Sequence, residues 1–330
     1  MLLAESLWTM LLTAFLAAIV SFSAYANDSI GSNGKAGCLS NPRQVDRLSI
    51  ESPGVYENIL IDGRWGESTL VKILADNVTL RNCEIHSGKH NAVLVAGKNV
   101  VIESCKIHHV LAGTFLDQKD AHGITGHPQN LQIRNCEIGM VSGDSIQFDP
   151  GRGIWDEVLV ENCSFWTGPL EVDAAGFHRG ERPGENAVDT KQRISNPRSR
   201  MTIRNCLFQG WKQPGQVKNL AALNIKNHVR VQIVNCAFRE NEICLRLRGG
   251  EGEYGGAIAT VERCAVYDSE FALRIEDKIR DLKIHLLGIG RGVGKTLVSA
   301  GGGAGPGFEI SEEFRPPSWE DITKAGIQQR

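Results

Sequence analysis

The chain has 330 residues, a formal net charge of −2 and nine cysteines. That length is enough for one large solenoid or for two ordinary domains. Because there is no basic excess, the composition argues against a nucleic-acid-binding protein. Local groups of charge therefore have to carry any functional argument.

The chain begins with a segment typical of export. An apolar run of sixteen residues covers 7–22, and Ala24 and Ala26 follow at the small-residue positions of a signal-peptidase site. We predict a signal peptide over 1–26, a secreted or periplasmic location, and no membrane span after cleavage. The run is preceded by Glu5 and by no Lys or Arg, so a membrane anchor is the alternative, although the run is short for a span.

A short phrase recurs seven times along the chain. Each copy has three to five β-forming residues, then usually Asn-Cys, then one residue and an apolar side chain. Self-similarity with a period in the twenties to forties is typical of a solenoid, in which each repeat forms one coil. The copies are VTLRNCEI (78–85), VVIESCKI (100–107), LQIRNCEI (131–138), VLVENCSF (158–165), MTIRNCLF (201–208), VQIVNCAF (231–238) and ATVERCAV (259–266).

A further strand is predicted before each phrase. Apolar and polar residues alternate in these strands, so one face is buried and the other faces outward. With an Asn turn that tolerates the left-handed region, this predicts an all-β fold, a single-stranded right-handed parallel β-helix of about nine coils. The expected organisation is a lead-in over 27–54, the β-helix over 55–287 and a Gly-rich C-terminal cap or tail over 288–330.

Seven of the nine cysteines occupy the same slot of the repeat. We predict a reduced column of small apolar fillers inside the solenoid. Disulfides between neighbouring coils are the alternative, because coils lie ~4.8 Å apart. Cys38 and Cys244 lie outside the slot. The repeat also predicts a stacked ladder of turn asparagines, formed by Asn82, Asn135, Asn162, Asn205 and Asn235.

These coils resemble the pectate-lyase-like superfamily of right-handed parallel β-helix proteins over about 55–287. The resemblance implies a polysaccharide bound across the outward face of the first sheet, between long loops. Lyases with a lysine base are most similar, through GENAVDTK (184–191) and LNIK (223–226). The fold also hosts hydrolases, epimerases and adhesins, so it does not fix the activity.

Charge gathers on the outward face of the first strands. Residues at equivalent positions of neighbouring coils are expected to lie ~4.8 Å apart. The loops over 108–121 and 166–185 are long and would wall this face. One predicted column reads Thr125, Gln147, Asp189, Asn224, Arg246 and Arg274; the column two residues later reads His127, Asp149, Lys191, Lys226, Arg248 and Glu276.

The columns predict β-elimination on an acidic polysaccharide. Removing the C5 proton of a uronate requires positive charge at its carboxylate and a base. We predict Lys191, Lys226 and Arg248 as catalytic residues, and we expect the neighbouring cations to lower a lysine pKa toward neutrality. The predicted substrate-binding residues are His122, His127, Asn224, Arg246 and Arg274.

Four acidic residues near the lysines predict a Ca²⁺ site, because carboxylate oxygens are the ligands that calcium prefers. We expect a monomer. Two other functions stay open: a glycan-binding or surface protein without catalysis, and a glycoside hydrolase that pairs Asp144 or Asp149 with Asp189. A third alternative is structural: the lysines and acids form ion pairs with one another along the sheet and have no part in a reaction. The predicted calcium ligands are Asp144, Asp149, Glu185 and Asp189.

Overall fold

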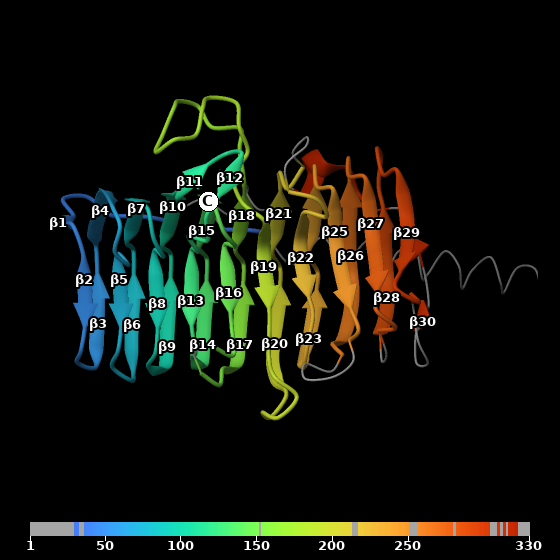
Figure 1. Ribbon diagram of the computed structural model, residues 1–330, viewed down its shortest axis with the longest axis horizontal. Coiled ribbons are helices and arrows are strands. Elements are labelled where there is room, and N and C mark those ends of the chain that lie inside the picture. Colours follow the sequence, from blue (N-terminus) through green and yellow to red (C-terminus); the bar gives the residue numbers. More distant parts are fainter. Residues whose placement is uncertain are drawn as a thin grey trace, which may run out of the picture.

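The computed structural model describes residues 30–32, 36–151, 153–212, 217–250, 256–279, 282–303, 309–310, 313–314 and 316–322. They form a long stack of coils of parallel strands (Figure 1). The expected signal peptide lies outside these residues. Within them, no helix combines the length and the apolar character that crossing a bilayer requires.

The first sheet has ten parallel strands, one more than the nine coils expected. It begins before residue 55 and continues past 287, so regular coils extend into both segments that the sequence assigns to the ends. Its strands are β2 (Leu48–Ile50), β5 (Val71–Ile73), β8 (Val93–Val95), β13 (Ile124–Gly126), β16 (Ile146–Phe148), β19 (Asn186–Thr190), β22 (Ala221–Ile225), β25 (Ile243–Arg248), β27 (Phe271–Glu276) and β29 (Lys295–Ala300).

The repeated phrase forms the other two sides of each coil. The second side consists of β3 (Gly54–Glu57), β6 (Val78–Arg81), β9 (Lys98–Glu103), β14 (Gln129–Arg134), β17 (Asp156–Glu161), β20 (Ser199–Arg204), β23 (Val229–Val234), β26 (Ile258–Tyr267), β28 (Leu282–Ile289) and β30 (Glu309–Ile310). The third side consists of β1 (Arg43–Val45), β4 (Ile59–Gly66), β7 (Glu84–Gly88), β10 (Lys106–Val110), β15 (Glu137–Val141), β18 (Ser164–Trp166), β21 (Leu207–Gln209), β24 (Ala237–Arg239), the long strands β26 and β28, and β31 (Glu313–Phe314). A right-handed β-helix results, as predicted.

The repeated residues do what their spacing predicts. The turn asparagines have positive φ, near 50°, and Asn235 Nδ2 donates to Asn205 Oδ1 at 2.8 Å. The seven cysteines that follow are buried in the core, and all nine cysteines are free. Small thiols at one slot therefore fill the inside of the corner, where a bulkier side chain would clash with the next coil.

Two long loops lead directly into strands of the first sheet. The loop before β13 contains the hairpin β11 (Gly113–Thr114) and β12 (Asp117–Gln118), and the loop before β19 stands above it (Figure 1). The backbone N–H of Gly184 donates to Gln118 Oε1 at 2.8 Å and joins them. An apolar cluster away from the main core, formed by Leu111, Met140, Leu170 and Phe177, also packs them together.

The N-terminal lead-in runs across the coils rather than along one strand. The N–H of Gly31 donates to Asn205 O, that of Gly37 to Ser104 O, and that of Leu39 to Asn58 Oδ1, at 2.8–2.9 Å. These acceptors belong to coils far apart in the stack. The lead-in therefore fastens several coils, a role that the sequence did not indicate.

Candidate functional site

The predicted outward column exists in the register of the first sheet. Backbone pairing aligns Thr125 with Gln147, Gln147 with Asp189, Asp189 with Asn224, Asn224 with Arg246, and Arg246 with Arg274. The residues between them point inward, because Ile146, Val188, Leu223 and Leu245 are in the core. The sequence therefore predicted which side chains share a face, although they lie up to 149 positions apart.

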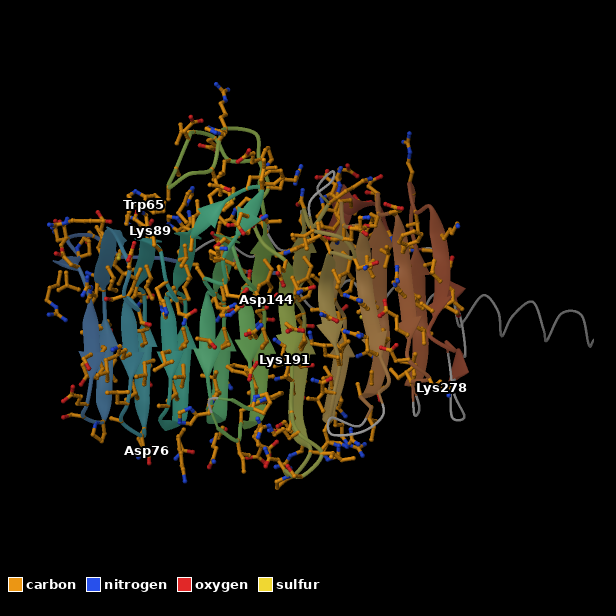
Figure 2. The ribbon with its side chains drawn as sticks, in the orientation of Figure 1. Trp65, Asp76, Lys89, Asp144, Lys191 and Lys278 are labelled. Carbon is orange, nitrogen blue, oxygen red and sulfur yellow. The ribbon has the colours of Figure 1, made fainter. Side chains whose placement is uncertain are left out.

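Asp189 and three side chains of the column two residues later form what we call the lysine cluster: Asp149, Asp189, Lys191 and Lys226. Lys226 Nζ lies 2.9 Å from Asp189 Oδ1, and Lys191 Nζ lies 3.4 Å from Asp189 Oδ2 and 3.6 Å from Asp149 Oδ2. The Asp189 side chain is only 3% exposed, whereas those of Lys191 and Lys226 are 28% and 16% exposed. One buried carboxylate thus holds two ammonium groups at the surface of the sheet (Figure 2 labels Lys191).

The expected lowering of the Lys191 pKa is wrong for this arrangement. Burial alone would lower the pKa of Lys191, but Asp189, Asp144 and Asp149 outweigh that effect and raise it. Counting only the cations in the column had left out these acids. Lys191 is therefore an ammonium ion at neutral pH.

Asp144 lies beside this cluster but is withdrawn from solvent. It is 1% exposed, and its oxygens accept hydrogen bonds from Asn186 Nδ2 and Gln147 Nε2, both at 2.7 Å. Burial, followed by the charges of Asp189 and Glu185, raises its pKa well above the usual range. A carboxyl group this deeply buried is not placed to flank a glycosidic bond, which weighs against a hydrolase that uses Asp144.

The predicted calcium ligands are engaged with other protein groups. Asp149 and Asp189 face lysines, and Asp144 accepts from two amides. Glu185 lies at the rim, where burial and then the charges of Asp120 and Asp189 raise its pKa. Across the described residues, no three His, Cys, Asp or Glu side chains are grouped so as to hold a metal ion. Calcium binding stays a prediction.

The later coils carry a second group, the arginine cluster: Arg246, Arg248, Arg274 and Glu276. Arg246 Nε and a terminal nitrogen bind the two Glu276 oxygens at 3.0 and 3.1 Å, and Arg248 Nε lies 3.2 Å from Glu276 Oε2. Arg274 Nε also donates to Glu276. Burial would raise the pKa of Glu276, but the guanidinium groups of Arg246 and Arg274 outweigh it and lower that pKa.

The remaining predicted residues differ in accessibility. His122 is 3% exposed, and its Nδ1 accepts from the backbone N–H of Asp144 at 3.0 Å, so it supports the sheet rather than facing a substrate. His127 is half-buried. Asn224 is 4% exposed, and among the described residues its Oδ1 has no hydrogen-bond partner.

Sequence reasoning missed the groups that fix the backbone of the two lysines. The buried Trp155 donates from Nε1 to Lys191 O at 2.8 Å, and Thr190 Oγ1 accepts from the N–H of Lys226 at 3.1 Å. Trp155 lies in an irregular stretch between β16 and β17, where no repeat pattern signals which carbonyl it will meet. The inward alternation of Thr190 was visible, but its cross-coil partner was not.

Comparisons with known proteins agree with this architecture. The family model described as a right-handed beta helix region matches residues 71–217. The alginate lyase from Paenibacillus sp. str. FPU-7 is similar in structure, with 13% identity, coverage of 79% of this chain and 88% of that one, and a TM-score of 0.53. The Dettilon tailspike protein has 12% identity, coverage of 80% and 52%, and a TM-score of 0.53, so this chain spans about half of its length.

The pectate lyase Pel9A is also similar, with 12% identity, coverage of 89% and 72%, and a TM-score of 0.48. A sequence search among curated proteins gave no match. The match and the structural likeness show the right-handed parallel β-helix fold that the repeats predicted. Identities this low establish the fold and leave the activity to be argued from the site.

Proposed function

We propose that this protein is an exported polysaccharide lyase that cleaves a uronic-acid-containing glycan by β-elimination on the outward face of the first sheet. One observation carries the proposal: Lys191 and Lys226, from adjacent coils, converge on the single buried carboxylate of Asp189. The outward column and the two long loops supply a surface along which a polymer can lie.

The two lysines have different parts in the proposed reaction. Lys226 is more buried and closer to Asp189, which holds its side chain in place to neutralise the substrate carboxylate. Lys191 is more exposed and takes the proton from C5. The electron pair forms the C4–C5 double bond, the bond from C4 to the glycosidic oxygen breaks, and that oxygen leaves with a proton from water.

The raised pKa of Lys191 sets the pH range of this reaction. An amine acts as a base only after losing its proton, and nearby carboxylates make that loss harder. Elimination should therefore accelerate above neutral pH, as the neutral fraction of Lys191 grows.

The proposal is tested by incubating the protein with alginate, polygalacturonate and glucuronan and recording the ultraviolet absorbance of the unsaturated product. Lys191→Ala and Lys226→Ala should each abolish the signal. Lys72→Ala is the matched control, because Lys72 is an exposed lysine of the same sheet, in the column of Asp189 and four coils from it. If both active-site variants retain the parent rate, the assignment is wrong. Repeating the assay with a chelator and with added Ca²⁺ tests the predicted calcium requirement.

A non-catalytic glycan-binding protein is the second candidate, because both lysines are already ion-paired. The two functions give different products. A binding protein would retard in a gel that contains polyuronate but would leave polymer length and absorbance unchanged.

A further inference from the structure

The charge along the outward column is one-sided with respect to Lys191. Toward the N-terminal coils, the next three positions of the column are Gln147, Thr125 and Leu94, and none is cationic. Toward the C-terminal coils, Asn224 is followed by Arg246 and Arg274. Within three coils on either side of Asp189, a polymer lying along the stack would meet positive charge from this column only on the C-terminal side; the next cation on the other side, Lys72, is four coils away.

Asn224 supplies an independent sign of a ligand between the lysine and arginine clusters. Its neighbours Leu223 and Ile225 face the core, so its amide points to the same face as Asp189. The residue is 96% withdrawn from solvent, yet within the described part of the chain Oδ1 has no hydrogen-bond partner. A buried polar atom without a partner is costly, and a sugar hydroxyl donating to it would remove that cost.

The arginine cluster retains capacity for an anion. Three guanidinium groups contact two carboxylates, those of Glu276 and Asp277, and the charge of Glu242 also acts on Arg274, so the capacity for an anion lies in free N–H donors rather than in net charge. Each guanidinium has five N–H donors, and the hydrogen bonds to Glu276, Asp277 and the carbonyl of Asn219 use only some of them. The side chains of Arg248 and Arg274 are 32% and 23% exposed. Their forked donors match a carboxylate better than a point charge would.

We propose that the arginine cluster, two to three coils from Lys191 on the C-terminal side, and Asn224, on the coil between, form a subsite for a second uronate. The inference rests on the proposed function for its position relative to the cleaved bond. Coils lie ~4.8 Å apart, about the length of one sugar in an extended chain. The enzyme would thus require an acidic sugar two to three residues from the cleaved linkage, on one side only.

The experiment compares binding and cleavage of one polyuronate and of its methyl-esterified form, in which the carboxylates are uncharged. The polyuronate is chosen from alginate, polygalacturonate and glucuronan as the one from which the parent protein forms the most product. If none reacts, it is the one that most retards the parent protein in a gel that contains it. Binding is measured by affinity electrophoresis. The parent should bind the free acid at least about tenfold more tightly than the ester, since charge-assisted contacts are lost on esterification.

Arg274→Gln and Arg246→Gln should each weaken binding to the free acid about tenfold while changing binding to the ester little. Asn224→Ala should weaken both about fivefold, because it removes a neutral contact. Arg200→Gln is the matched control, because Arg200 is paired with Asp156 on another side of the coil. Arg246→Lys keeps the charge but not the fork, and should recover part of the loss if the fold is intact.

The outcomes separate this inference from the proposed function. If Lys191→Ala binds like the parent and the arginine variants lose acid preference, the subsite is supported, whether or not product forms. If product forms and the folded arginine variants keep the parent's preference, the subsite is wrong and the lyase stands. If the parent binds no polyuronate, both are wrong.

Discussion

The lysine cluster and the arginine cluster lie on the same sheet and look alike, since each gathers cations around one buried carboxylate. They differ in what the cations can do. A lysine can lose its proton and act as a base, whereas an arginine stays charged at any ordinary pH. The comparison favours proton transfer at Lys191 and anion binding at Arg246, on different coils of the same sheet.

The largest expected effect separates these roles by kinetics. Lys191→Ala should lower kcat by about 10²–10⁴-fold, the contribution of a general base. Arg274→Gln should mainly raise KM, because it removes a contact made equally by the ground state and the transition state. Steady-state rates of double-bond formation measure both. Equal losses of kcat in the two variants would remove the distinction between the clusters.

A second comparison concerns stability. Glu276→Gln should cost about 4 kcal/mol in the free energy of unfolding, because three guanidinium groups lose their buried partner. Asp189→Asn should cost less, since the ammonium groups of its two lysines are better hydrated than guanidinium groups and sit on flexible stems. Urea denaturation of both variants checks the order. A stability loss for Asp189→Asn that exceeds that of Glu276→Gln would contradict it.

A third prediction concerns acid unfolding, which we expect to depend on a histidine of the third side, His108, and not on the lysine or arginine cluster. Burial lowers the pKa of His108 to about 4, and the neighbouring His109 and His86 add to this, although Glu84 opposes it. The folded pKa of His108 lies below the unfolded value of 6.5, so the unfolded state takes up a proton more readily. The free energy of unfolding that neutral His108 contributes is therefore fully present above pH 6.5 and is lost as the pH falls toward 4. It amounts to about 3 kcal/mol.

His108→Asn is the test of that prediction. The variant should show a flatter loss of unfolding free energy between pH 6.5 and 4 than the parent, in urea titrations at each pH. Some acid sensitivity should remain, because burial also lowers the pKa of His109. Identical curves for parent and variant would show that His108 does not carry the effect.

The smallest effect concerns the pH profile. Asp149 helps to raise the pKa of Lys191, so Asp149→Asn should move the alkaline rise in kcat to lower pH, by less than about one unit. Arg274→Gln should leave that midpoint unchanged, since Arg274 lies three coils away. A shift to higher pH in Asp149→Asn would mean that another group controls the rate.

Much of the fold and half of the site were predictable from local signals. Alternation in 144–149, 186–191 and 221–226 predicted the strands, and aligning their outward positions predicted the register that places Asp189, Asn224 and Arg246 in one column. The pairing of the lysines with Asp189 was one of the alternatives that the sequence left open. The predicted shift of the Lys191 pKa had the wrong direction. Asp144 lies in a coil that a long loop separates from Asp189 in the sequence, and how deeply the two carboxyl groups are buried beside Lys191 could not be predicted from the sequence.

The sequence alone determined the coil, because its signals are local: a two-residue alternation, an asparagine that accepts positive φ and a small cysteine at the corner. Only the tertiary structure decided how the charges are shared. Which acid faces which cation depends on side-chain burial and on atomic distances between coils, and electrostatic energies change steeply with both.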